Sequence, residues 1–505
     1  MEQEIKILTT NKSLGQKQVV LDCKVLAESG KEIGKVLSIS AKPILISCEC
    51  LTGQMTIAGK TNFKIVYLTE NADIVCANNI VDFQEVFESD FITATSNGNV
   101  ELKVVDVTTP SVKVNEIKVA SIIDIIASAS INSECPIAQI EGAIFTKKSV
   151  TEITEQKCTF DDTFDLETDI KIADNLKTVV SVDNDISVKE SYSGANFVVV
   201  SGEVFCNILY IKDDNTLASY KEAINFKQEI SVPNVTADSI IVAKAIPLDY
   251  LAKVVVSQEN GYNLVRMELP ITNKGVVYEN TIIDHIEDAY SCEQLLDFEY
   301  GEYEKLQSIV VSSFSDNVKG QLTLPATEDI KYYNLLGFCA IGTEVSNSFA
   351  TDDKLTVEGV ISGTLFYKGE QSEDIMSIIA EVPFAINNAN TDFEGVKNFN
   401  VNIGITDWDM TIRAGSEVDI IVSLNAYVFG YENGNVQIVK SINEVGARPN
   451  SDCAIEIVVA RDGQMLWELG KQMGVPIEQI LLQNKGITEP LEGGQKIIMY
   501  HPLNR

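Results

Sequence analysis

Apolar and polar residues alternate with a period of two through most of the chain. Clear runs of this kind, rich in branched residues, are Leu102–Thr108, Val112–Val119 and Val418–Tyr427. A period of two places successive side chains on opposite faces of a strand, so these runs are predicted to be half-buried β-strands. A cluster of turn residues separates strands at Lys212–Thr216, and the dipeptides Asn260-Gly261 and Asn433-Gly434 are typical of hairpin turns. Most of the chain is therefore predicted to be antiparallel β-sheet.

An internal repeat divides this β-rich region into three units. In each unit a tyrosine follows a glycine by eight residues, and a phenylalanine follows that tyrosine by 16 or 17 residues. The three sets are Gly59, Tyr67 and Phe83; Gly202, Tyr210 and Phe226; and Gly359, Tyr367 and Phe384. Such constant offsets predict equivalent strand positions in three similar folds. We expect each tyrosine to pack over a sheet edge with its hydroxyl group in solvent.

The fold class expected from this pattern is mainly β, with three tandem antiparallel β domains of the sandwich or barrel-like type. The strand rhythm breaks at Lys147–Glu152 and at Asp297–Glu304, where polar residues gather. Gly, Pro, Asn and Ser gather again before residue 453, which is typical of a linker. The predicted domains are 1–148, 149–300 and 301–445, followed by a linker at 446–452.

The C-terminal segment changes period. The expected elements are a strand at Ile455–Ala460, amphipathic helices at Gln464–Met473 and Ile477–Asn484, and a strand at Lys496–Tyr500. This order predicts a small β-α-α-β domain at 453–502. Trp467 is expected to lie in its core, because it stands on the first helix beside the apolar residues Leu466 and Leu469.

The chain has 505 residues, and its 39 Lys and Arg against 73 Asp and Glu give a formal net charge of −34. So acidic a surface disfavours nucleic acid and anionic membranes as direct partners. Apolar residues make up 45% and charged residues 22%, as in ordinary globular domains, which argues against disorder. The N-terminus has no apolar leader and no apolar run is long enough to span a membrane, so a soluble cytosolic protein with reduced thiols is expected.

Residues suited to catalysis are few. The two histidines are His285 and His501, and a catalytic triad or a histidine-based zinc site would need one of them. Neither stands in a sequence context typical of such a site. Gly53–Thr61 superficially resembles a phosphate-binding loop, but five residues separate its glycines and a strand follows it in place of a helix. The sequence thus predicts that the protein is not an enzyme, and it predicts no catalytic residue and no cofactor.

The sequence gives little indication of a metal-binding site. The ten cysteines include no CxxC pair. Cys48 and Cys50 would share one face of a strand, where they could hold a soft metal ion or act as small buried hydrophobes, and the second interpretation is favoured. The acidic pairs, which lack the spacing of a calcium loop and are expected in solvated turns, are Asp161-Asp162, Asp213-Asp214 and Asp352-Asp353. No metal site is predicted.

The C-terminal segment resembles the LysM domain family. The matching stretches are Gly463–Trp467, Gly474–Ile477, Leu481–Asn484 and Gly494–Ile498. LysM domains typically bind N-acetylglucosamine-containing glycans in a shallow groove between two loops, so the resemblance implies a groove for a glycan or a protein partner. Its residues would be Asp462, Gly463, Gln464 and Met465 from one loop and Gly486, Ile487 and Thr488 from the other, with Arg461 and Asp462 at a polar rim.

Two positions in this groove favour a protein partner. Gln464 and Met465 stand where the family has an acidic residue followed by serine or threonine. A methionine in place of a hydroxyl group removes a hydrogen bond suited to sugar and adds an adaptable apolar surface. Met465 and Ile487 are therefore expected to form an apolar centre. From residue 451 onward the chain has five Lys/Arg and seven Asp/Glu, so recognition is expected to come from the groove and not from bulk charge.

The three upstream units resemble the SPOCS domain family of spore coat proteins, on the strand ending Ile65-Val66-Tyr67 and the later Phe226-x-x-x-Ile230 pattern. Three such units before a LysM domain form an arrangement similar to that of spore morphogenesis proteins. The resemblance implies a non-enzymatic scaffold for spore coat assembly in the mother-cell cytoplasm, at the forespore surface. Its implied partners are the coat basement-layer ATPase, stage IV sporulation protein A, and other coat proteins. The alternative is a cell-wall or spore-cortex protein whose LysM domain binds peptidoglycan.

Overall fold

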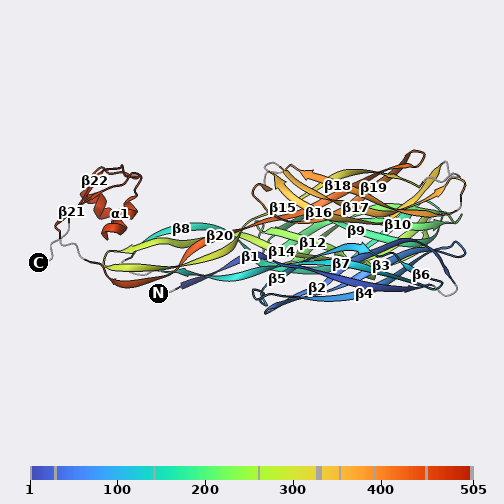
Figure 1. The fold of residues 1–505 in the computed structure, drawn as a ribbon, viewed down its shortest axis with the longest axis horizontal. Coiled ribbons are helices and arrows are strands. Elements are labelled where there is room, and N and C mark those ends of the chain that lie inside the picture. Colours follow the sequence, from blue (N-terminus) through green and yellow to red (C-terminus); the bar gives the residue numbers. More distant parts are fainter. Residues whose placement is uncertain are drawn as a thin grey trace.

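The computed structural model describes residues 3–27, 31–139, 144–259, 262–325, 332–351, 354–372, 374–389, 393–449 and 453–500. Antiparallel strands make up most of this part of the chain, and its two α-helices lie near the C-terminus. The prediction of a mainly β fold is confirmed. Figure 1 shows long strands that pack together at one end of the molecule and narrow toward the C-terminal helices at the other.

The first group of strands is a β-sandwich. One sheet contains β1 (Gln3–Leu26), β7 (Glu116–Ala138), β5 (Asn97–Val107) and the short β6 (Ser111–Lys113). The other has the order β2-β3-β4 and consists of β2 (Ile33–Leu51), β3 (Gln54–Thr69) and β4 (Ile74–Glu88). Alternate residues of both sheets meet in one apolar core that includes Met55, Phe63, Ile117 and Ile123. The period of two in the sequence thus supplies the face that each sheet turns toward the other.

The second and third groups repeat this arrangement. One sheet of the second group contains β8 (Ile144–Ile172), β14 (Tyr262–Ser291), β12 (Ile240–Pro247) and β13 (Lys253–Glu259). The other sheet contains β9 (Leu176–Gly194), β10 (Phe197–Lys212) and β11 (Leu217–Ser231). A 3-10 turn, η1 (Asp249–Leu251), precedes β13. The third pairs β15 (Gln294–Thr323), β20 (Glu417–Ala447) and β19 (Asn398–Ala414) with β16 (Tyr333–Thr351), β17 (Lys354–Gly369) and β18 (Met376–Asn388). Each pair of sheets encloses an apolar core, and the first and last strands of each group are neighbours.

The repeated glycines and phenylalanines form cross-strand pairs. The pairs, each between the middle strand of a three-stranded sheet and its neighbour, are Gly59 with Phe83, Gly202 with Phe226, and Gly359 with Phe384. A Cβ atom at these glycines would lie 2.2, 2.8 and 2.6 Å, respectively, from the facing ring. The ring therefore lies over the glycine and fills the space of a side chain. Because strand register fixes which residues face each other, the spacing between them is nearly constant.

The repeated tyrosines also stand at equivalent places, near the ends of β3, β10 and β17. Tyr67, Tyr210 and Tyr367 are all buried, so the expectation that their hydroxyl groups reach solvent is wrong. Tyr210 donates a hydrogen bond of 2.8 Å to Asp174, which lies just before β9. Tyr367 packs edge-on against Tyr333, the first residue of β16, at 5.8 Å between ring centroids. The start of a neighbouring strand covers the tyrosine in both cases, which periodicity alone does not reveal.

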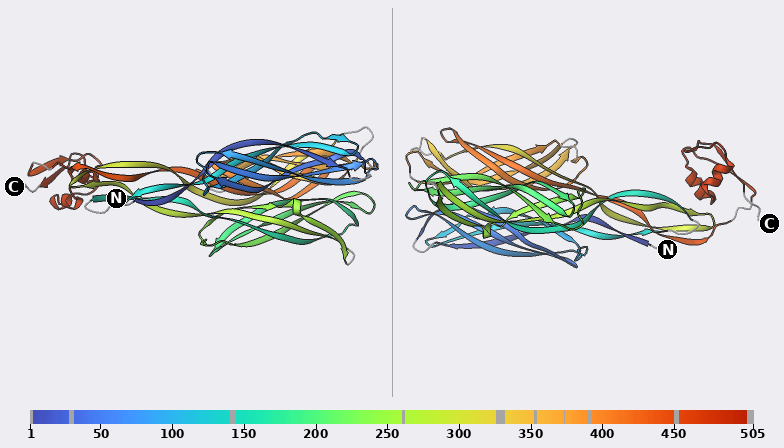
Figure 2. Two further views of the ribbon diagram at one scale, coloured as in Figure 1. Left: turned by 90° about the horizontal axis from the view of Figure 1, so that it is seen from below. Right: turned by 180° about the vertical axis from the view of Figure 1, so that it is seen from behind.

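The first and last strands of each group continue past the sandwich as a two-stranded ribbon. We call the three ribbons together the stalk, which comprises residues 3–10, 131–138, 144–155, 279–291, 294–308 and 432–447. Figures 1 and 2 show the stalk as the narrow part of the molecule. Its interior takes apolar residues from all three ribbons, including Leu8, Cys135, Ile153, Ile283 and Ile438. The ribbons therefore stabilise one another by apolar packing away from the sandwiches.

The stalk explains the two breaks in the strand rhythm. Lys147–Glu152 lies inside β8 and Asp297–Glu304 lies inside β15, so neither segment interrupts a strand. Both segments are rich in polar residues because one face of each ribbon is open to solvent. The turn predicted at Lys212–Thr216 is present between β10 and β11. Asn433-Gly434 is not a hairpin turn, because it lies within β20 beside a β-bulge; Asn260-Gly261 lies outside the described residues.

The three sandwiches lie side by side around a common centre (Figure 2), and not in a line. Apolar residues from all three groups meet there, including Leu37, Val66, Leu209, Cys339 and Phe366. This arrangement brings the edge strands β2, β9 and β16 of the three-stranded sheets against a neighbouring group. The backbone groups at such an edge have no partner in their own sheet and must be satisfied by the neighbour when they are buried.

Lys64, three residues before the repeated Tyr67, supplies a hydrogen-bond donor to the backbone of β9, the edge strand of the second group. Its Nζ donates to the carbonyl oxygen of Val182 and forms an ion pair of 2.8 Å with Asp183, and both of these residues belong to β9. Burial alone would raise the pKa of Asp183, but the Lys64 ammonium group lowers this pKa below its ordinary value. The charged form of the pair is therefore favoured at neutral pH.

The residues equivalent to Lys64 in the other two groups complete a ring. Asn207 of the second group donates from Nδ2 to the carbonyl oxygen of Phe338 on β16 at 2.6 Å. Ser38 on β2 donates from Oγ to Oγ1 of Thr364 in the third group at 2.9 Å. The first group thus binds the second, the second binds the third, and the third binds the first.

Replacing the middle repeated glycine should destabilise the second sandwich. In Gly202→Ala the new Cβ would lie 2.1 Å from the carbonyl oxygen of Ser187 and 2.8 Å from the Phe226 ring. Overpacking of this kind costs about 1–3 kcal/mol, which urea unfolding would measure. Gly342→Ala is the matched control, since a Cβ there meets nothing within 4 Å. Equal stability of the two variants would contradict the role of the glycine–phenylalanine pair.

Removing the amide that joins the second and third groups should also lower stability. Asn207→Ala leaves the carbonyl oxygen of Phe338 without this donor inside the ring. An unsatisfied buried acceptor costs about 1–3 kcal/mol, to be measured by thermal and urea unfolding. Asn225→Ala, at an exposed position on the neighbouring strand β11, serves as the control. A loss no greater than that of the control would show that the ring does not depend on this contact.

Candidate functional site

The C-terminal unit, residues 453–500, has the order β-α-α-β. Strands β21 (Ile455–Val459) and β22 (Lys496–Tyr500) form an antiparallel pair, and helices α1 (Leu466–Met473) and α2 (Ile477–Gln483) connect them. Their inward residues form a separate small core that includes Leu466, Leu469, Ile480, Ile497 and Met499. The first helix begins two residues later than the pattern predicts. It ends at Gly474, whose φ of 69° is the left-handed conformation that favours glycine.

The two loops that the sequence assigns to one groove lie side by side. Gly463 donates from its backbone amide to the carbonyl oxygen of Leu491 at 3.0 Å, and Leu491 donates to the carbonyl oxygen of Gln464 at 2.9 Å. These two bonds join the loop before α1 to the loop after α2. The structure thus brings together two stretches that stand more than twenty residues apart in the chain.

Two polar side chains of the first loop accept hydrogen bonds from backbone amides of the C-terminal unit itself. Gln464 Oε1 accepts a hydrogen bond of 3.0 Å from the backbone amide of Arg461, and this bond closes its own loop. Asp462 Oδ1 accepts one of 3.3 Å from the amide of Gly493. In contrast, Met465 is 42% exposed. An exposed apolar residue framed by internally bonded polar groups is better suited to a protein surface than to sugar hydroxyl groups.

The second loop contributes a mixed surface. Gly486 and Thr488 are exposed, as is Arg461 from the first loop. Ile487 is half-buried and packs against the core of the C-terminal unit, so part of this side chain supports the loop from inside. All the predicted groove residues therefore lie on the two joined loops, with Met465 as the most accessible apolar side chain among them.

Glu489 is a structural residue of this site that the sequence reasoning missed. Its Oε1 accepts a hydrogen bond of 2.5 Å from the backbone amide of Leu466, the first residue of α1. Met465 holds the N-cap position of this helix and has no side-chain acceptor. A carboxylate from the opposite loop therefore accepts a hydrogen bond from a free amide at the start of α1, as an N-cap side chain would, and also complements the helix dipole. The absence of Ser, Thr, Asp or Asn at position 465 was the signal that could have pointed to it.

Removing this carboxylate should loosen the start of α1. Glu489→Ala is expected to destabilise the helix by about 1 kcal/mol, as for loss of an N-cap. Hydrogen–deuterium exchange of α1 peptides in the full chain would report the loss as faster exchange. Glu492→Ala removes an exposed glutamate in the same region and is the control. Unchanged exchange in Glu489→Ala would refute the capping role.

Trp467 does not lie in the core of the C-terminal unit, contrary to the prediction. Its Nε1 donates to Asp288 Oδ2 at 2.8 Å, and its ring meets the ring of Tyr290 edge-on at 5.0 Å between centroids. Tyr290 in turn donates from its hydroxyl group to the carbonyl oxygen of Val475 at 3.0 Å. Since successive helix residues point about 100° apart, Leu466 faces the small core while Trp467 faces the end of the stalk.

Two cations strengthen the contact between α1 and the stalk. Arg448, just after β20, donates to the carbonyl oxygens of Lys471 at 2.8 Å and Gln472 at 3.2 Å, which lie in the last turn of the helix. Lys471 forms an ion pair with Asp288. A guanidinium group at a helix C-terminus satisfies free carbonyl oxygens and complements the dipole. β20 itself extends to Ala447, into the predicted linker, whose residues 450–452 lie outside the described part of the chain.

A cavity of about 1390 Å³ lies where the three sandwiches meet. Its lining comes from all three groups and carries many charged side chains, several of which are held in ion pairs. Lys42 lies 2.9 Å from Asp249, and Lys274 lies 2.9 Å from Asp161. Paired charges of this kind can stand in an interior that would not tolerate them singly. We therefore interpret the cavity as part of the junction between the groups.

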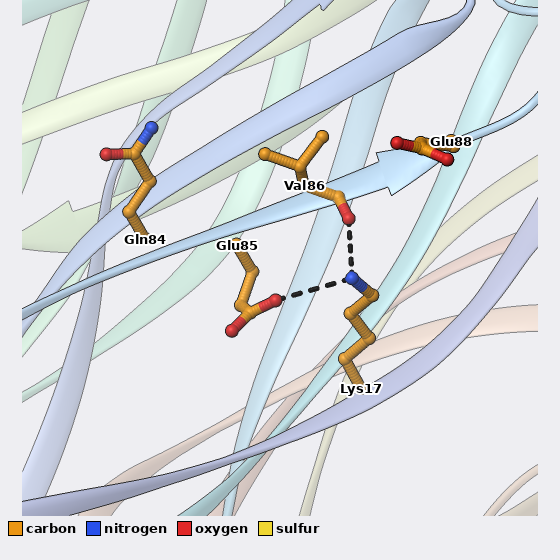
Figure 3. A pocket seen from close by; sticks show the side chains of 5 residues that line it. All are labelled: Lys17, Gln84, Glu85, Val86 and Glu88. Atoms are coloured by element: carbon orange, nitrogen blue, oxygen red, sulfur yellow. Dashed lines mark hydrogen bonds and ion pairs between the residues drawn. The ribbon is translucent and has the colours of Figure 1, made fainter.

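A second hollow, of about 650 Å³, opens on the surface between β1 and β4 (Figure 3). Lys17 of β1 donates from Nζ to the carbonyl oxygen of Val86 at 2.6 Å and lies 3.4 Å from Glu85. Figure 3 shows this lysine reaching across to Glu85 and Val86 of β4, with Glu88 farther along the strand. The amine links the two sheets of the first sandwich.

The histidine and the cysteine pair considered as candidates for catalysis or metal binding are packed into the β-structure. His285 is buried on β14 and lies 3.0 Å from Thr151 Oγ1, whereas His501 lies outside the described residues. Cys48 and Cys50 both pack against Gly98, and burial raises the pKa of Cys48 to about 12, so its thiol stays protonated at neutral pH. Within the described ranges, no group of three or more His, Cys, Asp or Glu side chains is placed to hold a metal ion.

The remaining motifs of the sequence are ordinary parts of the β-structure. Gly53 lies in the turn between β2 and β3 with a φ of 84°, and Gly59 stands in the middle of β3. Asp161-Asp162 belongs to β8 and not to a turn, while Asp213-Asp214 occupies the predicted turn after β10. Asp352-Asp353 lies outside the described residues.

Two segments of the first and second groups are similar in sequence to a known protein family. Residues 32–115 and 175–255 match the family model described as SipL, SPOCS domain. The two segments cover corresponding elements, β2 to β6 in the first group and β9 to the start of β13 in the second. SPOCS is a non-catalytic sporulation domain family, so the match supports a SipL-like, sporulation-related protein. No curated protein and no solved structure matches this chain. Among the described residues, no helix is both long and apolar enough to cross a membrane.

Proposed function

We propose that this protein is a non-enzymatic adaptor for spore coat assembly, with three SPOCS units followed by a LysM unit as in SipL and, by arrangement, SpoVID. The third group of strands is assigned to the same type because it has the same glycine–phenylalanine pair and the same buried tyrosine as the two matched segments. The β-α-α-β order and the joined loops support the LysM assignment for residues 453–500.

The proposed partner is stage IV sporulation protein A, the coat basement-layer ATPase, bound by the two joined loops of the LysM unit. The observation that carries this proposal is the environment of Met465. This side chain is exposed, while the neighbouring Gln464 and Asp462 accept hydrogen bonds from within the unit. A site in which the apolar group is free and the polar groups are engaged favours contact with an apolar protein surface. Such binding would place the adaptor at the forespore surface, in the mother-cell cytoplasm, where further coat proteins assemble.

The position of the LysM unit fits an adaptor. Trp467, Lys471 and Arg448 hold it at the end of the stalk, and Met465 is not part of that contact. Figure 1 places the unit at the opposite end of the molecule from the three sandwiches. Partner binding at one end would therefore leave the sandwich surfaces free for other interactions.

Met465→Asp tests this function in the full chain. Aspartate is a preferred N-cap residue, so the change at the N-cap of α1 should not harm folding. Loss of a central apolar contact should weaken binding to purified stage IV sporulation protein A by at least ~2 kcal/mol, about thirtyfold in Kd, as measured by calorimetry. A fluorescent fusion of the variant should lose its position at the forespore surface.

Leu482→Asp is the matched control, because Leu482 is also exposed but lies on α2, outside the two loops. It should bind the partner like the unaltered protein. An equal loss in both variants would place the interface elsewhere. Tight binding of chitooligosaccharide that Met465→Asp abolishes, with partner binding unchanged, would favour the peptidoglycan-binding alternative.

A further inference from the structure

Strand β13 is an edge strand open to solvent on both faces. Within the described part of the chain it pairs with β14 and with no second strand. Every residue from Lys253 to Gln258 is exposed. Three of these residues are consecutive valines, Val254, Val255 and Val256, with exposed fractions of 36%, 59% and 41%. An exposed apolar edge is a ready template for pairing with a further strand.

The inner face of β13 continues the core of the second sandwich without a cover. Val254 stands opposite Met267 and Val256 opposite Val265 in the β13–β14 register. Met267 and Val265 are fully buried, whereas the two valines are partly exposed. The apolar side chains of the core therefore continue across β14 onto β13, where no further strand of the described chain covers them. A strand added beyond β13 would cover them and remove the valines from water.

The corresponding edges of the other two groups are protected. In the first group the equivalent strand, β6, has three residues. In the third group the equivalent part of β19 has Asp409 and Arg413 on its exposed side. Short length and outward charges are two known ways of blocking pairing at an edge. The second group has one such charge, Lys253, at the start of β13, but none across Val254, Val255 and Val256, so this apolar stretch of the edge is open.

We propose that β13 binds a second copy of this chain, antiparallel, so that two middle sandwiches share one continuous sheet. The strand is complementary to itself about Val255. With Val255 facing Val255, Val254 of each copy faces Val256 of the other, and Lys253 faces Ser257. Apolar residues thus meet apolar residues, and no like charges stand directly opposite each other. A two-fold arrangement of this kind closes after two copies.

The charges near this edge permit the approach of two acidic chains. Lys253 lies 2.9 Å from Glu268, and Arg266 lies 2.8 Å from Asp169 on the same outer face. The cations and carboxylates therefore balance locally, although the whole chain has a net charge of −34. At physiological salt, charges farther away than about 8 Å are largely screened. A single added strand buries little area, so the dimer is weak and depends on concentration, as suits a protein gathered on a surface.

The test is the oligomeric state of the full chain, measured by sedimentation velocity over a series of concentrations at physiological salt. The unaltered protein should show a reversible monomer–dimer equilibrium. Val255→Lys places two lysines opposite each other at the two-fold axis, and Val255→Glu places two glutamates there. Each variant alone should dimerise about tenfold more weakly or worse, since it loses apolar contact and adds like-charge repulsion. Melting curves that match that of the unaltered protein would show that both variants are folded.

An equimolar mixture of Val255→Lys and Val255→Glu decides the geometry. Lysine then faces glutamate at the axis, so the mixture should recover dimers that neither variant forms alone. Val255→Thr keeps a β-branched residue and should dimerise like the unaltered protein. A monomer at every concentration, or single variants that dimerise as well as the unaltered chain, would overturn the proposal. This outcome would leave the binding of stage IV sporulation protein A untouched, because the measurement contains no partner protein.

Discussion

The architecture depends on satisfying the backbone of buried edge strands. A sheet of three strands leaves a row of amide and carbonyl groups at each edge, and burying that row without partners is costly. Here one repeat position, three residues before the buried tyrosine, forms a contact to a neighbouring group in all three groups, and in the first two this contact reaches a backbone carbonyl oxygen of the edge strand. Lys64 reaches β9 and Asn207 reaches β16, while Thr364 accepts from Ser38 on β2. These contacts let the three sandwiches close around a centre without aggregation-prone edges inside it.

The stalk and the position of the C-terminal unit follow from this ring. Because the sandwiches lie side by side, their first and last strands leave at the same end and can share an apolar interior around Leu8, Ile153 and Ile438. The stalk then offers Asp288 and Tyr290 to Trp467 of the C-terminal unit. The C-terminal unit is thereby held at the end of the stalk, away from the sandwiches.

The candidate site was accessible to sequence reasoning only in part. The two loops were placed by their resemblance to LysM, and backbone hydrogen bonds between Gly463 and Leu491 join them. Glu489 was missed because an N-cap supplied from another loop leaves no local pattern. Trp467 was misplaced because Asp288, its partner, lies 179 residues away and neither residue marks the other in the sequence. Alternation wrongly predicts that the tyrosine hydroxyl groups reach solvent, because it shows which face of a strand is apolar and not what covers the end of the strand.

The sequence by itself determined the β class, the repeat of glycine, phenylalanine and tyrosine, the two short helices and the acidic balance of the chain. These properties are local, since alternation, turn chemistry and strand register act between near neighbours. Only the tertiary structure decided that the sandwiches form a ring, that polar segments such as Lys147–Glu152 are strands of a stalk, and that β13 remains open. These features depend on contacts between residues far apart in the chain, such as Ser38 with Thr364, 326 residues apart, and the local alternation and turn chemistry of a sequence do not specify such contacts.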